Sequence, residues 1–257
     1  MTILIDCVPT LAESSQRCAA EVVRIASSCI ARGGRFTMVL CGGSTPRCLY
    51  GMLAGEPCRS RIDWQRVFLF WGDERCVAYD HPQSNFRLAR ETLLDQVPIP
   101  PENVFPMAQE AAPAEAARRY ERNLRLFFGF SAAQKGFPVF DLILLGMGED
   151  GHTASLFPGS AVLRETVRWV APVSPPATAA PAVPRLTLTL PVINQGATLF
   201  FLVSGQGKEK AVAAILQRSA AASRYPAFRV ASSGECRWFL SEVDCRLFAN
   251  IQRKEMP

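Results

Sequence analysis

Residues 141–152 have the sequence DLILLGMGEDGH, in which an apolar run leads directly into a glycine-rich polar segment. Residues 141–145 form a short, nearly continuous apolar run, which predicts a buried strand. Residues 146–152 contain three glycines and end in charged side chains, which predicts an irregular loop directly after that strand. Apolar strands that lead straight into polar loops are typical of parallel sheets that are covered on both faces.

The same order of elements recurs along the chain. Apolar runs that precede short polar or glycine-rich segments occupy residues 36–41, 67–71 and 198–203. Periodicity and composition predict helices over residues 9–32, 46–53, 82–94, 112–128 and 208–216. Strands that alternate with helices predict an α/β protein with a mostly parallel sheet flanked by helices.

The last third of the chain is less regular. Residues 172–184 (PVSPPATAAPAVP) have no periodicity, and they predict a loop close to the site rather than a linker between domains. Residues 186–190 predict a further strand, and residues 237–240 with 245–248 predict a closing hairpin. Because no internal repeat interrupts the pattern, residues 1–257 are expected to form a single domain.

Composition argues against several classes of protein. The net charge of +5 is spread without a dense basic block, which disfavours a nucleic-acid partner and fits either an anionic small substrate or an ordinary surface. No apolar run reaches the ~18 residues of a membrane helix, and residues 1–6 lack the features of a secretory signal. We therefore expect a cytoplasmic protein without a membrane partner, and its expected oligomeric state is a monomer or a weak homo-oligomer.

The cysteines and histidines do not indicate disulfides or metals. The nine cysteines are irregularly spaced and include no Cys-x-x-Cys pair, so we expect reduced thiols that fill the core. The two histidines, His81 and His152, lie outside any metal-ligand pattern, and no metal site is predicted. His81 precedes a predicted helix and is interpreted as a turn residue.

Polar segments follow the predicted strands at the point where each strand ends. They comprise residues 42–46, 72–75, 146–152 and 204–208. Ligands of parallel α/β sheets bind beyond the carboxyl ends of the strands. The sequence therefore predicts that these four segments gather at one edge and form the site.

The first of these segments has the features of an anion-binding loop. Gly42 and Gly43 let the backbone approach a ligand closely, and successive N–H groups can enclose an anion. The hydroxyls of Ser44 and Thr45 add donors at the start of a predicted helix, where the helix dipole favours negative charge. The alternative is an ordinary turn in which Ser or Thr caps the helix.

Two cations accompany this loop. Lys208 lies at the start of a predicted helix, where an ammonium opposes the helix dipole unless an anion is also bound there. Arg185 precedes the strand at 186–190 and is able to hold a phosphate through two parallel hydrogen bonds. The alternative for each is a solvated surface side chain.

His152 is the candidate general base. An imidazole beside a carboxylate suits that task, because its pKa lies close to neutral pH and Asp150 can orient the ring. The alternative is a structural histidine. Cys76 as a nucleophile is disfavoured, because most free cysteines are inert and His152 is its one plausible partner.

Charged and polar side chains after the strand at 67–71 complete the candidate site. Asp73 and Arg75 can orient sugar hydroxyls and an anionic group, although an internal salt bridge within Asp73-Glu74-Arg75 is the alternative. Asn85 and Arg87, on the next predicted helix, are expected to contribute in a similar way.

Taken together, these segments resemble the 6-phosphogluconolactonases, whose superfamily also contains the glucosamine-6-phosphate deaminases. The matching segments are residues 42–46, 71–75, 84–87, 146–158, 184–188 and 204–208. The resemblance implies a doubly wound, Rossmann-like α/β fold of the NagB type and no cofactor. It also implies hydrolysis of 6-phospho-D-glucono-1,5-lactone to 6-phospho-D-gluconate, the second step of the oxidative pentose phosphate pathway.

The resemblance also implies a role for individual residues. Those that it implies for phosphate binding are Ser44, Thr45, Arg185 and Lys208. Those that it implies for positioning the sugar, the water or the developing charge are Asp73, Arg75 and Asp150, and His152 is the implied general base.

Two alternatives differ in function. The deaminases usually follow the histidine with a stretch that ends in Asn-Glu-Pro, whereas residues 154–158 (ASLFP) contain no carboxylate. The deaminases also tend to carry an aromatic residue at the position of Arg75, so both departures favour the lactonase. The second alternative is a regulator that binds sugar phosphates without turning them over, and retention of the His152 loop argues against it.

Overall fold

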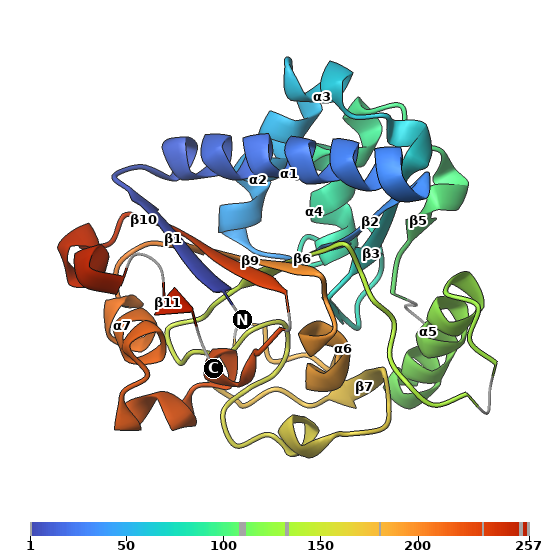
Figure 1. The fold of residues 1–257 in the computed structure, drawn as a ribbon. Helices are drawn as coiled ribbons and strands as arrows, with labels where there is room; N and C mark the ends of the chain where they lie inside the picture. Colours follow the sequence, from blue (N-terminus) through green and yellow to red (C-terminus); the bar gives the residue numbers. More distant parts are fainter. Residues whose placement is uncertain are drawn as a thin grey trace.

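A mostly parallel sheet forms the centre of the molecule (Figure 1). The structure is a computed structural model that describes residues 2–107, 112–131, 134–179, 181–232, 234–251 and 254–255. Within these residues the sheet has eight strands in the order β11-β1-β10-β9-β6-β2-β3-β5. The strands are β1 (Thr2–Val8), β2 (Phe36–Leu40), β3 (Val67–Trp71), β5 (Val104–Phe105), β6 (Leu142–Gly146), β9 (Thr198–Ser204), β10 (Glu235–Ser241) and β11 (Lys254–Glu255). All neighbours are parallel except β11 and β1, which confirms the predicted sheet.

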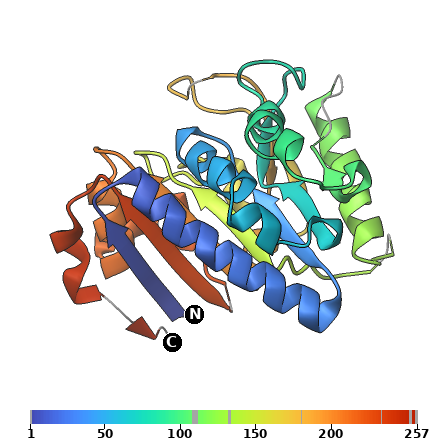
Figure 2. The ribbon, with the colours of Figure 1, turned by 90° about the horizontal axis from the view of Figure 1, so that it is seen from above.

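Helices cover both faces of the sheet, so the fold is doubly wound as expected (Figures 1 and 2). One face carries α1 (Leu11–Gly33), α2 (Ser44–Ala54), α3 (Cys58–Arg61) and α4 (Asn85–Thr92). The other carries α6 (Leu190–Asn194) and α7 (Glu209–Gln217), while α5 (Pro113–Phe127) lies to one side. Cover on both faces explains why β6 consists of four fully buried apolar residues before Gly146.

Short 3₁₀ helices connect several of these elements. They are η1 (Trp64–Arg66), η2 (Leu94–Gln96), η3 (Pro101–Asn103), η4 (Ala161–Arg164), η5 (Ala220–Arg224), η6 (Pro226–Arg229) and η7 (Cys245–Ile251). Among the described segments, no helix is both long enough and apolar enough to span a bilayer.

The helix ends follow local capping chemistry. Thr10 caps α1 by accepting a hydrogen bond from the N–H of Glu13 at 3.2 Å, and Gly34 ends this helix with a left-handed φ of 73°. The helix predicted from residue 82 begins only at Asn85, because the side chain of Ser84 caps it by accepting from the N–H of Arg87. The bounds of a predicted helix therefore shift by a few residues where a cap lies inside the pattern.

A second, antiparallel sheet stands beside the first. Its order is β4-β8-β7, and its strands are β4 (Asp73–Arg75), β8 (Arg185–Leu188) and β7 (Val170–Val173). The strand predicted at 186–190 is therefore β8, which begins at Arg185 and ends at Leu188, two residues before α6 starts at Leu190. The loop predicted at 172–184 begins inside β7, and its residue Ala180 lies outside the described residues.

The predicted C-terminal hairpin is wrong. Residues 237–240 belong to β10, which lies parallel between β1 and β9 in the main sheet, and residues 245–248 lie in the 3₁₀ helix η7. The register pairs Asp6 with Phe239, a partner far away in the sequence. A pattern of neighbouring residues carries no information on such a pairing. The strand β1 was not predicted.

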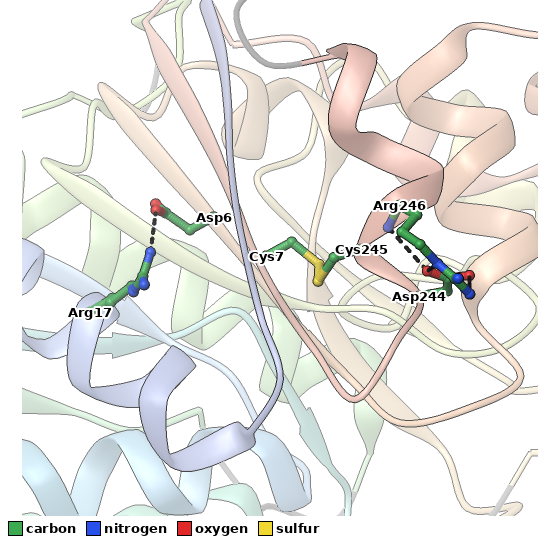
Figure 3. The surroundings of a disulfide bond; sticks show 6 residues. All are labelled: Asp6, Cys7, Arg17, Asp244, Cys245 and Arg246. Carbon is green, nitrogen blue, oxygen red and sulfur yellow. Dashed lines mark hydrogen bonds and ion pairs between the residues drawn. A yellow bond between two sulfur atoms is a disulfide. The ribbon is translucent and has the colours of Figure 1, made fainter.

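The expectation that all cysteines are reduced is also wrong for one pair. Cys7, near the end of β1, forms a disulfide with Cys245 at the start of η7, with the two Cα atoms 5.6 Å apart (Figure 3). The bond joins residues 238 positions apart in the sequence, so local cysteine spacing does not reveal it. The other cysteines are free, and they are Cys18, Cys29, Cys41, Cys48, Cys58, Cys76 and Cys236.

Candidate active site

A cavity opens at the carboxyl edge of the main sheet, where the four predicted polar segments meet. Ten of the predicted site residues line it, and they are Gly42, Gly43, Ser44, Thr45, Asp73, Arg75, Asn85, His152, Arg185 and Lys208. Cys41, Pro46, Gly146, Met147, Gly148, Ala154 and Leu202 complete the lining. The arrangement brings the candidate anion-binding groups and the imidazole to a single hollow.

The glycine loop connects β2 directly to α2. Gly43 is the N-cap residue, with a φ of 109° that favours glycine, and no side chain caps the helix. The first N–H groups of α2 are therefore not satisfied by a serine or threonine cap, which was the alternative interpretation of this loop. Ser44 and Thr45 lie in the first turn, beside free N–H groups and the positive end of the helix dipole.

Gly42 makes room for Asn85. A Cβ atom at Gly42 would collide with the amide group of Asn85, so only glycine lets the loop and α4 approach so closely. The Asn85 amide donates to the backbone oxygen of Asp73 at 2.9 Å. Asn85 thereby connects α4 to β4, and its amide lies directly against Gly42 of the glycine loop.

Lys208 lines the cavity and is the N-cap residue of α7. Burial lowers the pKa of its ammonium, and the negative charge of Glu149 only partly opposes this effect. A bound anion would restore the charged form that burial disfavours. Lys210, two residues further on, is exposed and does not line the cavity.

Two arginines occupy opposite positions on neighbouring strands. Arg75 of β4 pairs in register with Arg185 of β8, and both line the cavity. Burial lowers the pKa of Arg185, Asp73 opposes that shift, and the positive charge of Arg75 adds to it. The Nε of each arginine is buried without a hydrogen-bond partner. Each guanidinium donates one hydrogen bond to a backbone carbonyl, Arg75 to Gln83 at 2.7 Å and Arg185 to Pro181 at 3.0 Å. The buried Nε atoms remain as donors that an anionic ligand could satisfy.

His152 is held by its own loop. Its Nδ1 lies 2.6 Å from Asp150 Oδ1, and the same oxygen accepts the backbone N–H of His152 at 3.1 Å. Partial burial raises the pKa of Asp150, but the hydrogen bonds and charge of His152 outweigh it, so the net pKa lies below its usual value. With Nδ1 engaged, Nε2 is the nitrogen available to a reacting molecule. Asp150 itself does not line the cavity.

Neighbouring groups fix the conformation of this loop. Gly151 has a φ of 73°, its carbonyl accepts the N–H of Ala227 at 3.0 Å, and a Cβ atom there would strike the ring of Tyr225. On the other side, the imidazole of His152 packs against Phe157, with the ring centroids 4.7 Å apart. The sequence gives no local sign of Tyr225, because it comes from a separate segment more than seventy residues later.

Glu74 organises the wall of the cavity. Its buried carboxylate accepts the N–H groups of Arg75, Asn85 and Phe86 and the hydroxyl of Ser84, at 2.7 to 3.1 Å. Burial raises the pKa of Glu74, although the backbone hydrogen bonds oppose this effect. In place of the alternative, a salt bridge within Asp73-Glu74-Arg75, the Glu74 carboxylate is occupied by backbone N–H groups and the Ser84 hydroxyl.

Other predicted residues lie elsewhere or have a different role. Arg87 does not line the cavity, because its guanidinium pairs with Glu91 at 2.6 Å and donates to the Asp80 carbonyl. His81 accepts the N–H of Gln83 in a turn.

Burial raises the pKa of Cys76 to about 11, which makes it a poor nucleophile. Among the described residues, no group of three or more His, Cys, Asp or Glu is placed to hold a metal.

The chain is similar to known proteins in both sequence and structure. A family model described as glucosamine-6-phosphate isomerases/6-phosphogluconolactonase matches residues 9–238. A 6-phosphogluconolactonase of Synechocystis is 44% identical over 83% of this chain and 85% of its own. The structure of 6-phosphogluconolactonase from Trypanosoma brucei superposes with a TM-score of 0.81, at 30% identity and with 96% and 98% of the two chains covered.

A monomeric glucosamine-6-phosphate deaminase has the same fold. It superposes with a TM-score of 0.78 at 20% identity, over 95% of this chain and 99% of its own. Fold alone therefore does not distinguish the two activities, and the residues of the site must do so.

Proposed function

The chain belongs to the glucosamine-6-phosphate isomerase/6-phosphogluconolactonase family, and from that premise we propose that it hydrolyses 6-phospho-D-glucono-1,5-lactone to 6-phospho-D-gluconate. The observation that carries the proposal is that His152, paired with Asp150, lines the same cavity as the cations Arg75, Arg185 and Lys208. The reaction would form the second step of the oxidative pentose phosphate pathway.

The phosphate would bind at the start of α2. Its oxygens would accept hydrogen bonds from the uncapped N–H groups of this helix and from the hydroxyls of Ser44 and Thr45. Lys208 and Arg185 would supply the compensating charge, which agrees with the burial of Arg185 and the partial burial of Lys208. Because these groups contact the phosphate and not the lactone carbonyl, they would serve binding more than chemistry.

The lactone carbonyl would then face His152. Nε2 would remove a proton from water as the water oxygen attacks C1 of the lactone, and Asp150 would stabilise the imidazolium that forms. The bond from C1 to the ring oxygen then breaks, and the imidazolium returns the proton to that oxygen. A general base typically contributes about 10²- to 10⁴-fold to such a step.

Arg75 and Asp73 would act next to the reacting carbon. The Arg75 guanidinium would stabilise the negative charge on the carbonyl oxygen, an effect worth about 3 kcal/mol per well-placed donor. Asp73 would accept hydrogen bonds from sugar hydroxyls. A sugar lactone is an activated ester, so these groups suffice without a covalent intermediate.

Phe157 supports the lactonase over the deaminase. Its ring is buried, packs against His152 and lies 5.4 Å below the Arg185 guanidinium. It belongs to the stretch 154–158, in which the deaminases usually carry a glutamate. An apolar ring cannot transfer the protons that ring opening and isomerisation of an amino sugar require.

Two assays on the same preparation test the proposal. The first follows opening of freshly generated 6-phosphogluconolactone, with the spontaneous rate measured without protein. The second follows release of ammonia from glucosamine 6-phosphate. We expect acceleration in the first assay alone. Activity confined to the amino sugar, or tight phosphosugar binding without turnover, would overturn the proposal.

A further inference from the structure

We propose that Ser155 is a positioning residue, whose buried hydroxyl holds the Asp73 carboxylate in its working orientation. The inference rests on the proposed function, because it assigns Asp73 to the sugar. Ser155 is fully buried and does not line the cavity, so its hydroxyl acts only through Asp73, the residue to which it donates.

The contact between the two residues is short and charge-assisted. Ser155 Oγ donates to Asp73 Oδ2 at 2.6 Å, a length typical of a hydroxyl bound to an ionised carboxylate. The second oxygen, Oδ1, is held weakly, because the Asn85 amide lies 3.4 Å away and gives its better hydrogen bond to the Asp73 backbone. Ser155 is thus the principal restraint on this carboxylate.

The position of Ser155 is itself fixed on both sides. Its N–H donates to Thr187 Oγ1 at 3.3 Å, and Thr187 is the register partner of Asp73 across β4 and β8. Ser155, three residues after His152, therefore contacts both β4, which carries Asp73, and β8, which carries Arg185. This contact makes the His152 loop and the Asp73 wall a single unit.

A competing orientation explains why the restraint is needed. Asp73 lies near two guanidinium groups. Its negative charge opposes the lowering of the Arg185 pKa, and Arg75 follows Asp73 by two residues on the same strand. Without the Ser155 hydroxyl, Asp73 would be drawn toward these guanidinium groups. It would then leave the sugar and neutralise cations that the substrate needs.

A double-mutant cycle tests the proposal. Ser155→Ala should lower kcat/KM about 10- to 100-fold in the wild-type background, as expected for loss of a hydrogen bond to a charged group. In the Asp73→Asn background the same change should alter kcat/KM by less than about twofold, because the residue through which it acts is already neutral. A purely structural role would give equal losses in both backgrounds, and that result would overturn the proposal.

Ser232→Ala provides a matched control. Ser232 is also buried, and its hydroxyl donates to the Gly196 carbonyl at 2.6 Å, near the amino ends of β9 and β10. It should lower thermal stability much as Ser155→Ala does, with equal and small effects on kcat/KM in both backgrounds. A Ser155→Ala protein with wild-type kinetics would contradict the proposal.

Product binding keeps the test independent of turnover. If Asp73→Asn reduces hydrolysis to the spontaneous rate, the same cycle is measured on the dissociation constant of 6-phosphogluconate by calorimetry. Non-additive losses there support the positioning role, and additive losses reject it. Failure of the proposed function appears separately, as a wild-type protein that does not accelerate lactone opening.

Discussion

Asp150 Oδ1 lies 2.6 Å from His152 Nδ1, although only Gly151 separates the two residues in the chain. Such a short connection is possible because Gly151 adopts a left-handed φ of 73°. One loop therefore holds both the imidazole and the carboxylate that orients it, and the geometry of the pair depends on that glycine.

Gly151→Ala should impair this loop more than an equivalent change elsewhere. Gly159 has a similar φ of 72° but open space around the Cβ position, whereas a Cβ at Gly151 meets the Tyr225 ring. Gly159→Ala should cost about 1 to 2 kcal/mol of unfolding free energy from backbone strain alone, with unchanged kcat. Gly151→Ala should cost more and also lower kcat. Denaturant unfolding and steady-state kinetics measure both, and equal effects of the two variants would contradict the account.

The acid limb of the pH profile should not come from Asp150. The pKa of Asp150 in the folded protein lies below its ordinary value. The ionised carboxylate therefore stabilises the fold at pH values above the pKa of the unfolded chain, and this contribution is lost as the pH falls through the pKa of the folded protein. Asp150 therefore remains ionised between about pH 5 and 8. Asp150→Asn should lower kcat yet leave an acid limb in kcat/KM against pH. Disappearance of the limb in this variant would assign it to Asp150.

Lys208→Ala should mainly raise KM, by about tenfold or more, because loss of a charged hydrogen bond to phosphate weakens binding. The exposed Lys210, on the same helix, is the matched control, and Lys210→Ala should leave KM unchanged. Because burial lowers the pKa of Lys208, KM in the wild type should rise as alkaline pH removes this charge. A fall in kcat at constant KM would contradict its assignment to the phosphate.

Reduction of the Cys7–Cys245 disulfide should lower stability (Figure 3). Its removal should cost about 2 to 4 kcal/mol, chiefly because the bond restricts the unfolded chain. Thermal unfolding with and without a dithiol reductant measures this effect. The Cys7→Ser, Cys245→Ser double variant should match the reduced protein and not respond to reductant, while Cys58→Ser should behave as wild type. Equal stability with and without reductant would contradict a structural role for the bond.

Local sequence patterns predicted the elements whose partners and caps lie nearby. The apolar runs at 36–41, 67–71, 141–145 and 198–203 are all strands of the main sheet, because burial on both faces leaves a continuous apolar signature. The convergence of four loops followed from the parallel arrangement alone. This part of the site needed no knowledge of side-chain contacts.

Long-range pairings were not predictable in this way. β1 and β10 are neighbours across more than 230 residues of sequence, and so are Cys7 and Cys245. Ser155 lies in the largely apolar stretch 154–158, whose composition is typical of core residues, and only the fold brings its hydroxyl to Asp73. Arg87 does not line the cavity with Asn85, because the helical pattern says nothing of the direction in which its side chain pairs, and a role for it at the site stays a prediction.

The role of His152 as general base is tested most directly by comparing His152→Ala with His81→Ala, which changes the other histidine of the chain. Steady-state lactone hydrolysis, corrected for the spontaneous rate, should show kcat reduced about 10²- to 10⁴-fold in His152→Ala with a modest change in KM. His81→Ala should retain wild-type kinetics. A His152→Ala protein that keeps its kcat, or that loses only affinity, would contradict the account.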